Sequence, residues 1–304
     1  MINSDTKLIA LFGNPIKNSF SPYIHNYLFE KYKINNIYTC FNIENIENGI
    51  ESIKTLCFIG GNITIPHKTD VIKYLDFVDN NSKIIDAVNT IKNENGYLKG
   101  YNTDGEGFVK SILDKNHSLK DKNILVIGAG GSSKSICVSL CNHNIKSLKI
   151  FNRTLENAQK IKDIIDDKFY IRTCISNKEM AKIQNKEIVK ISNKKITEKD
   201  LENIDIIINT TSVGMESDEC PINKNIKIKD ILVCDIVYKP HETEFIKWAK
   251  SNNLDVVYGI DMLINQAFLA FNIWTNIMPD DEDFVYLKNL FDEYKIWFFS
   301  QYFK

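Results

Sequence analysis

A glycine-rich loop is the first group of residues whose types and spacing could do chemistry. It follows directly on the apolar run 123–127, and its residues are Gly128, Ala129, Gly130, Gly131 and Ser132. A tight turn between a strand and a helix leaves backbone N–H groups free at the helix N-terminus, where they can bind a pyrophosphate. Ser133 takes the position of the third glycine in the usual GxGxxG pattern, but the turn glycines are intact. The loop therefore predicts a dinucleotide-binding site.

A polar triplet, Asn152, Arg153 and Thr154, ends the next apolar run. In a dinucleotide fold the adenosine ribose is recognised about 20 residues after the glycine loop, usually by an acidic residue when the cofactor is NAD. An amide, a guanidinium and a hydroxyl instead suit a ribose 2′-phosphate. The triplet therefore predicts NADP as the cofactor. Glu156 has the wrong sign for a phosphate, so we expect the preference over NAD to be less sharp.

Four short polar segments in the first part of the chain each lie at a predicted strand end or in a loop, where ligand-binding groups concentrate. They cover residues 18–22, 62–68, 87–90 and 101–105. Their side chains are hydroxyls, amides, one ammonium group and one carboxylate, a set that suits a small polyhydroxylated carboxylic acid. Each segment alone has an ordinary explanation as a helix cap, a turn or a solvated charge. Only their combination indicates a binding site.

The elements that must position these residues alternate between strand-like and helix-like segments, and 304 residues fit two α/β domains better than one. In the first part, Ser21 is predicted to cap a helix that has Pro22 in its first turn. We expect strands over residues 7–12, 37–41, 58–65, 84–91 and 97–101, and helices over residues 21–32, 46–56 and 104–116. The sheet of this domain is predicted to be mixed and mostly parallel.

The second part predicts a Rossmann-like, doubly wound parallel sheet, because its strands read as continuous apolar runs separated by helical sequence. The expected strands cover residues 123–127, 147–151, 204–209, 231–235 and 255–258. Two amphipathic helices, over residues 261–277 and 281–302, are expected to close the chain. Residues 176–200 are rich in Lys and Asn and give no clear assignment.

Composition excludes several classes of function. A net charge of -1 with dispersed charges gives no basic face, which argues against nucleic acid as a partner. The seven cysteines follow no metal-binding spacing, so we expect no metal and a reducing compartment. No run approaches the ~18 apolar residues of a membrane span, and the first residues do not form a signal peptide. We therefore expect a cytoplasmic protein without membrane contact.

The ordered set of motifs resembles the shikimate dehydrogenase family. The four polar segments come first, followed by the glycine loop and the triplet at 152–154. Two later groups extend the similarity. One is the strand-end loop 209–215. The other consists of residues 235–240 and 259–263, followed by Thr243 and Gln266 respectively. The resemblance runs from about residue 8 to about residue 275.

This resemblance implies the reversible, NADPH-dependent reduction of 3-dehydroshikimate to shikimate, in the pathway to chorismate and the aromatic amino acids. It implies a catalytic pair formed by Lys68 and Asp104. The implied substrate contacts are Ser19, Ser21, Asn62, Thr64, Lys68, Asn89, Asp104, Tyr238 and Gln266. The implied NADP contacts are Gly128, Ala129, Gly130, Gly131, Ser132, Asn152, Arg153, Thr154, Thr210, Gly214, Gly259 and Met262.

The expected domain boundaries follow from these assignments. Residues 1–103 together with 259–304 are expected to form the substrate-binding catalytic domain, and residues 104–258 the NADP-binding domain. Two alternative functions stay open: a quinate/shikimate dehydrogenase with relaxed cofactor use, and a non-catalytic ligand sensor on the same scaffold. For the oligomeric state, a homodimer stays open. The intact Lys68 and Asp104 argue against the sensor, and Arg153 argues against NAD.

Overall fold

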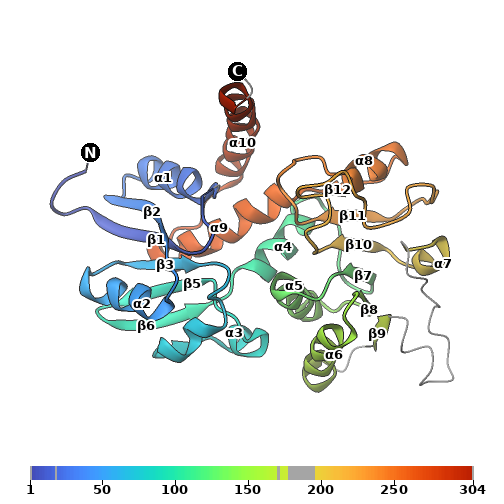
Figure 1. The fold of residues 1–304 in the computed structure, drawn as a ribbon, viewed down its shortest axis with the longest axis horizontal. Coiled ribbons are helices and arrows are strands. Elements are labelled where there is room, and N and C mark those ends of the chain that lie inside the picture. The colour runs from blue at the N-terminus through green and yellow to red at the C-terminus, as the bar shows by residue number, and fades with distance from the viewer. Residues whose placement is uncertain (1, 18, 170–171, 177–195, 303–304) are drawn as a thin grey trace. The chain divides into compact units, whose positions relative to one another are not determined.

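The computed structural model describes residues 2–17, 19–169, 172–176 and 196–302 (Figure 1). The chain forms two compact units. Unit 1 comprises Met1–Gly107 and Ile264–Lys304, and unit 2 comprises Phe108–Leu263. Each unit carries one six-stranded sheet with helices packed against it. The predicted α/β fold class is confirmed. The unassigned stretch 176–200 lies largely outside the described residues.

Unit 1 contains a mixed sheet in the order β2-β1-β3-β5-β6-β4. Its strands are β1 (Lys7–Gly13), β2 (Asn36–Asn42), β3 (Gly60–Ile63), β4 (Phe77–Val78), β5 (Thr90–Glu94) and β6 (Tyr97–Tyr101). The pairs β1/β2, β1/β3 and β4/β6 are parallel, whereas β3/β5 and β5/β6 are antiparallel. The prediction of a mixed, mostly parallel sheet is therefore correct.

The helices of unit 1 pack against this sheet or against one another. They are α1 (Ser21–Lys31), α2 (Ile46–Thr55), the 3-10 turn η1 (Asp70–Tyr74), α3 (Asn80–Ile85) and α10 (Asp281–Tyr302), with parts of α4 (Asp104–Leu113) and α9 (Gly259–Thr275). Helix α10 packs against α1. Phe12, Ile50 and Val88 belong to one buried cluster of this unit. On α9, the Trp274 indole donates to the Ile91 carbonyl at 2.9 Å and so fixes this helix to β5.

Two local predictions for unit 1 were wrong. Ser21 is the first residue of α1 and not its N-cap, which is Phe20 without a side-chain cap. The strand expected over residues 84–91 begins only at Thr90, because α3 occupies Asn80–Ile85. Asp79 caps α3 by accepting from the Ser82 amide at 2.9 Å. An N-cap of this kind stabilises the short helix and prevails over the apolar pattern of the segment.

Unit 2 contains a fully parallel sheet in the order β12-β11-β10-β7-β8-β9. Its strands are β7 (Asn123–Ile127), β8 (Ser147–Phe151), β9 (Arg172–Ser176), β10 (Ile206–Asn209), β11 (Leu232–Asp235) and β12 (Val256–Val257), and its further helices are α5 (Gly131–Asn142), α6 (Leu155–Phe169), α7 (Glu198–Leu201) and α8 (Glu244–Ser251). Consecutive residues of β7 point to opposite faces of the sheet: Leu125 belongs to one buried cluster and Val126 to the other. The doubly wound sheet is thus confirmed.

The order of strands in unit 2 determines where a ligand can bind. β7 pairs with β8 on one side and with β10 on the other, so the chain reverses its direction of winding there. In open α/β sheets, ligands bind at the carboxyl ends of the strands beside such a reversal. The loops that follow β7 and β10, which begin at Gly128 and Thr210, are therefore the expected ligand-binding loops.

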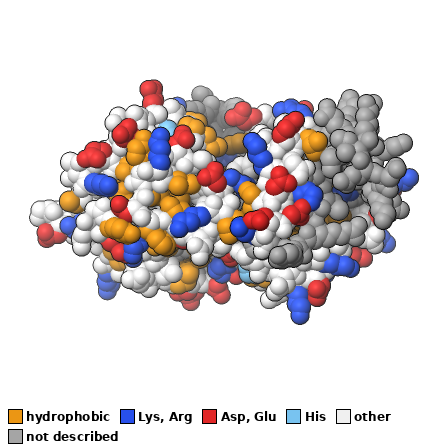
Figure 2. Space-filling model, turned by 90° about the horizontal axis from the view of Figure 1, so that it is seen from below, with side chains coloured by type: hydrophobic (Ala, Val, Ile, Leu, Met, Phe, Trp, Pro, Cys, Tyr) orange, Lys and Arg blue, Asp and Glu red, His pale blue; other side chains and the backbone are white. Residues whose placement is uncertain are grey.

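Neither sign of charge dominates the composition, since the net charge is -1. On the face drawn in Figure 2, basic and acidic side chains are interspersed. Among the described residues, no helix is long and apolar enough to cross a membrane, and no group of three His, Cys, Asp or Glu side chains could hold a metal ion. Cys137, Cys141, Cys220 and Cys234 are buried, Cys40 is half-buried and Cys57 is exposed.

Candidate active site

Lys68 and Asp104 form an ion pair in unit 1. The Lys68 ammonium lies 2.6 Å from the Asp104 carboxylate, with Nζ bound to Oδ2. Lys68 stands in the loop after β3, and Asp104 is the first residue of α4. Their side chains are 24% and 11% exposed, so both are partly shielded yet can be reached from solvent. A cation and an anion held together in this way can transfer or stabilise charge at a polar substrate.

Two predicted amides hold this pair from behind. Asn89 donates through Nδ2 to Oδ1 of Asp104 at 2.8 Å and to the Thr103 hydroxyl at 3.0 Å. Asn62 donates through Nδ2 to the Asn89 carbonyl at 3.1 Å. Both amides are buried. The structure therefore brings Asn62, Asn89, Lys68 and Asp104 into one hydrogen-bonded group.

Gln266 reaches the same group from α9. The Thr103 hydroxyl lies 3.4 Å from Oε1 of Gln266. The helices that carry these residues pack closely, because a Cβ atom built on Gly107 of α4 would lie 2.6 Å from the backbone nitrogen of Gln266. Only glycine allows this approach at residue 107. The close packing of α4 and α9 there is what lets Gln266 lie next to Thr103.

The remaining predicted residues of unit 1 lie at the ends of its first elements. Ser19 is half-buried, and its hydroxyl accepts a hydrogen bond from the Ser21 amide at 3.3 Å. Ser21 is buried at the start of α1. Thr64 is half-buried just after β3 and donates through its backbone to the Phe12 carbonyl at 2.9 Å. These hydroxyls are therefore placed on ordered backbone.

The predicted glycine loop of unit 2 has the geometry that phosphate binding requires. Gly128 has φ +110°, and a Cβ atom there would lie 2.5 Å from the Thr210 hydroxyl. Gly130 is the N-cap of α5. Cβ atoms built on Gly130 and Gly131 would meet nothing within 4 Å, so the space in front of this helix end is open. The residues present therefore fit a bound pyrophosphate.

Ser133 occupies the third glycine position without loosening the turn. Its side chain is fully buried and donates to the Gly128 carbonyl at 2.8 Å. The serine thus satisfies a carbonyl of the loop and keeps α5 close to β7. Ala129 and Ser132 complete the loop. Both are half-buried, and Ser132 lies in the first turn of α5.

The predicted ribose-binding triplet directly follows β8. Asn152 donates through Nδ2 to the Thr154 carbonyl at 2.6 Å, which orders the turn. Arg153 and Thr154 are exposed, as is Glu156. The Gly128 amide donates to the Phe151 carbonyl at 2.7 Å, so the glycine loop is attached to the end of β8. The triplet and the glycine loop therefore form one continuous edge of unit 2.

A second strand-end loop, residues 209–215, lies beside the glycine loop. The Thr210 hydroxyl donates to the Ile127 carbonyl at 2.7 Å, at the end of β7. Gly214 has φ +89° and packs against Thr243, because a Cβ atom there would lie 3.1 Å from the Thr243 Cβ. Both predicted residues of this loop, Thr210 and Gly214, are thus held by neighbouring segments.

Asp235 is a residue of this edge to which the sequence analysis gave no role. It is buried at the end of β11 and accepts from the Asn209 amide at 3.0 Å and from the Thr243 hydroxyl at 2.6 Å. Burial raises the pKa of its carboxyl group to about 6. Asp235 thereby links the end of β10 to the N-cap of α8. Its position at the start of the 235–240 motif is the sequence feature that could have singled it out.

Three predicted residues lie in the last part of unit 2. Tyr238 is half-buried after β11, and burial raises the pKa of its phenol above the ordinary value. Gly259 begins α9, and a Cβ atom there would lie 2.5 Å from the Ile236 carbonyl oxygen. Met262 is 9% exposed and packs in the apolar cluster of unit 2.

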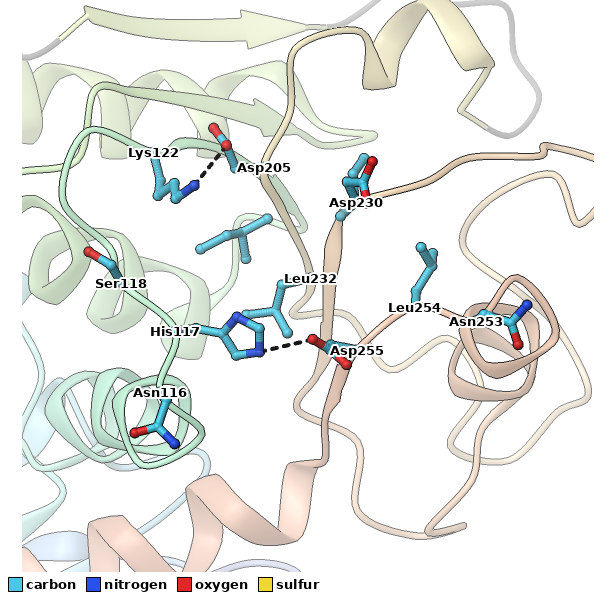
Figure 3. A pocket seen from close by; sticks show the side chains of 12 residues that line it. Asn116, His117, Ser118, Lys122, Asp205, Asp230, Leu232, Asn253, Leu254 and Asp255 are labelled. Carbon is cyan, nitrogen blue, oxygen red and sulfur yellow. Dashed lines mark hydrogen bonds and ion pairs between the residues drawn. The ribbon is translucent and has the colours of Figure 1, made fainter.

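A pocket of about 390 Å³ lies at the opposite, amino-terminal end of the same sheet (Figure 3). It is lined by segments that precede β7, β10, β11 and β12; Nε2 of His117 lies 3.5 Å from the Asp255 carboxylate, and an ion pair joins Lys122 to Asp205. It contains none of the predicted site residues. The pocket is therefore separate from the chemistry considered above.

Comparison with known proteins agrees with this arrangement. Family models match residues 11–91 (shikimate dehydrogenase substrate binding domain), 109–199 (shikimate/quinate 5-dehydrogenase) and 259–284 (shikimate 5′-dehydrogenase C-terminal domain). The NADP(+) shikimate dehydrogenase of Caldanaerobacter subterraneus is 40% identical over 94% of this chain and 98% of its own length. That of Methanococcus aeolicus is 42% identical over 92% and 96%.

A solved structure extends the comparison to three dimensions. The shikimate 5-dehydrogenase of Thermus thermophilus, in complex with NADP(H) and shikimate, is similar with a TM-score of 0.78 and 26% identity. The match covers 94% of this chain and 99% of that protein. Because the two relatives above are 40% and 42% identical and are matched over nearly their whole length, the chain belongs to the shikimate dehydrogenase family.

Proposed function

We propose that this protein is an NADP-dependent oxidoreductase that interconverts 3-dehydroshikimate and shikimate, on the route to chorismate and the aromatic amino acids. The observation that carries the proposal is the ion pair of Lys68 and Asp104 at 2.6 Å within a group of amides and hydroxyls. A sensor of the same fold has no need of such a pair. The names of the relatives support the same activity.

The proposed substrate site uses the polar residues of unit 1. Ser19 and Ser21 bind the substrate carboxylate, and Thr64, Asn62, Asn89 and Gln266 bind its hydroxyl and carbonyl groups. Among the residues that the structure describes, the Tyr38 hydroxyl is the one donor to Oδ1 of Asn62, at 2.7 Å, so that atom retains a lone pair. It can therefore accept a hydrogen bond from a substrate hydroxyl. Tyr238 is a further proposed substrate contact.

The proposed chemistry follows from the charges of the pair. During reduction, negative charge develops on the substrate's carbonyl oxygen, and Lys68 provides a cationic donor there. Asp104 orients the Lys68 ammonium and can accept a hydrogen bond from a neighbouring substrate hydroxyl. Bound NADPH supplies the hydride for the carbonyl carbon. In the reverse direction the same two side chains withdraw the proton from the shikimate hydroxyl.

The proposed NADP site is the edge of unit 2 formed by the glycine loop and the triplet. The start of α5 is open at Gly130 and Gly131, because a Cβ atom built on either would meet nothing within 4 Å, and the amides of this helix end would bind the pyrophosphate. Arg153 and Thr154 are exposed and would bind the 2′-phosphate. The other proposed contacts are Gly128, Ala129, Ser132, Asn152, Thr210, Gly214, Gly259 and Met262.

The proposal extends to location and oligomeric state. We propose that the protein is cytoplasmic and that it can form a homodimer. Unit 1 is the proposed substrate-binding domain and unit 2 the NADP-binding domain. The second candidate function is a quinate/shikimate dehydrogenase with relaxed cofactor use, and the exposed Glu156 beside Arg153 favours it. Kinetics with shikimate and quinate, each with NADP⁺ and NAD⁺, separate the two: the primary proposal requires a clear preference for shikimate and NADP⁺.

A further inference from the structure

Five buried side chains of unit 1 form a continuous chain of hydrogen bonds that ends at Asp104. Tyr38 Oη lies 2.7 Å from Asn62 Oδ1, and Asn62 Nδ2 lies 3.0 Å from Thr90 Oγ1. Thr90 Oγ1 lies 2.9 Å from Asn89 Oδ1, and Asn89 Nδ2 lies 2.8 Å from Asp104 Oδ1. None of the five residues is more than 8% exposed. Bulk water therefore has little access to these bonds.

Sheet register brings the members of this chain together. β3 and β5 are antiparallel neighbours, and Asn62 stands directly opposite Thr90. Thr90 in turn stands opposite Tyr101 on β6, three residues before Asp104 opens α4. The path runs from Tyr38 on β2 past the intervening strand β1 to Asn62 on β3, and then through Thr90 on β5 to Asn89 and Asp104.

Backbone groups fix the orientation of both amides. The Thr103 N–H donates to the side chain of Asn89 at 2.9 Å, so the atom that faces it must be Oδ1 and the Asn89 NH₂ group faces Asp104. The Asn89 carbonyl can only accept, and it lies 3.1 Å from Asn62, so the Asn62 NH₂ group faces it. Oδ1 of Asn62 therefore points to Tyr38.

The direction of every hydroxyl follows from these two amides. Tyr38 must donate, since its partner is the oxygen of Asn62. Burial raises the pKa of the Tyr38 phenol well above its ordinary value, so the proton is present at neutral pH. Thr90 accepts from Asn62 and has a single proton, which goes to Oδ1 of Asn89. All donors in the chain therefore point toward Asp104, an arrangement in which successive hydrogen bonds strengthen one another.

We propose that Tyr38 and Thr90 are positioning residues that act together with the Thr103 N–H to hold Asn89 in place, so that it donates to Oδ1 of Asp104 and leaves Oδ2 to Lys68. The proposal rests on the proposed function, in which Asp104 acts with Lys68. Neither residue needs to touch substrate. An Asn89 amide turned the other way would place a carbonyl oxygen against the Asp104 carboxylate and disturb the 2.6 Å ion pair.

Substitutions at Thr90 test the proposal most sharply, because hydroxyl and methyl can be removed separately. Thr90→Val keeps the volume but removes the hydroxyl, and we expect kcat with shikimate to fall by about tenfold, the scale of one buried hydrogen bond. Thr90→Ser keeps the hydroxyl and loses the methyl, so it should lower the melting temperature yet keep kcat within about twofold. The KM for NADP⁺ should stay within about twofold in both.

Thr275→Val is the matched control, because Thr275 belongs to the same unit and its hydroxyl donates only to the Phe271 carbonyl, at 2.7 Å, in the part of the chain that the structure describes. It should leave kcat unchanged. If Thr90→Val retains wild-type kcat, or if Thr90→Ser loses as much as Thr90→Val, the proposal is wrong. A wild-type protein without shikimate-dependent turnover would instead refute the proposed function.

Tyr38→Phe provides a second variant, which is read through kcat. It leaves Oδ1 of Asn62 without its donor, so we expect kcat to fall severalfold. Ser21, a proposed carboxylate contact, also hydrogen-bonds with the Tyr38 hydroxyl, so the KM for shikimate is expected to change as well. Tyr32→Phe is its control, because the Tyr32 hydroxyl donates to Asp283 at 2.6 Å in the same unit but takes no part in the chain. A loss of turnover in Tyr38→Phe that Tyr32→Phe does not share supports the proposal. Equal effects in the two variants at equal melting temperature overturn the role of Tyr38.

Discussion

His25 makes the stability of unit 1 sensitive to acid. The imidazole is fully buried in α1, stacked on Tyr38 at 4.5 Å and edge-on to Trp274 at 5.1 Å between ring centroids. Neither ring nitrogen has a hydrogen-bond partner among the described residues. Burial lowers the pKa of His25 from 6.5 to about 3. The folded protein therefore keeps this ring neutral where the unfolded chain protonates it.

The size and sign of the effect follow from linkage. The unfolded chain binds a proton at His25 below pH 6.5 and the folded protein does not until about pH 3, so stability is full above pH 6.5 and decreases as the pH falls. At pH 5 the loss is about 2 kcal/mol, and by pH 3 it reaches about 4 kcal/mol. Against a typical total of about 5–15 kcal/mol, that is a large share.

His25→Leu removes the titrating group and fills the same apolar site. We expect its free energy of unfolding at pH 7.5 to equal or exceed that of the wild type, because two unpartnered buried nitrogens are replaced by methyl groups. Between pH 7.5 and pH 5 the wild type should lose about 2 kcal/mol more than the variant. Urea unfolding followed by tryptophan fluorescence at both pH values measures this difference, in which the other titrating groups cancel. Identical losses in the two proteins would refute the reasoning.

Three further predictions concern the site. Lys68→Ala should lower kcat by at least about 10²-fold, because general acid–base help is of that size; near-normal steady-state turnover would remove Lys68 from the chemistry. Gly107→Ala should raise the KM for shikimate and lower the melting temperature, because the new methyl group would lie 2.6 Å from Gln266; unchanged values of both would contradict the close packing. Glu156→Lys should lower the KM for NADP⁺ by about fivefold, the scale of one exposed charge pair, with the KM for NAD⁺ as its control; equal changes for both cofactors would place Glu156 away from the 2′-phosphate.

Much of the fold could be predicted because local sequence and burial agree. The apolar run of β7 is buried on both faces, β8 alternates buried and half-buried residues, and the bounds of both strands match the prediction. α3 was missed because the capping of a short helix by Asp79 is a stronger local signal than the isoleucines that suggested a strand. β4 has only two residues, too few to show a period.

The site was predictable only where a residue type is unusual for its place. Lys68 and Asp104 are charged residues in polar motifs, and the sequence singles them out for that reason. Tyr38 and Thr90 read as ordinary strand residues, since aromatic and β-branched side chains favour strands. What distinguishes them is the partner of each hydroxyl, and that partner depends on the register of β3 against β5. Register is a property of the folded sheet and is not contained in the segment itself.

The central claim is the NADP-dependent oxidation of shikimate, and initial rates test it most directly. Purified protein is given shikimate or quinate with NADP⁺ or NAD⁺, and reduced nicotinamide is followed by its absorbance. We expect rapid NADP⁺ reduction with shikimate, and weak rates with quinate or with NAD⁺. Comparable rates with quinate or NAD⁺ would assign the protein to the relaxed quinate/shikimate enzymes, and no rate with any of the four combinations would contradict the account.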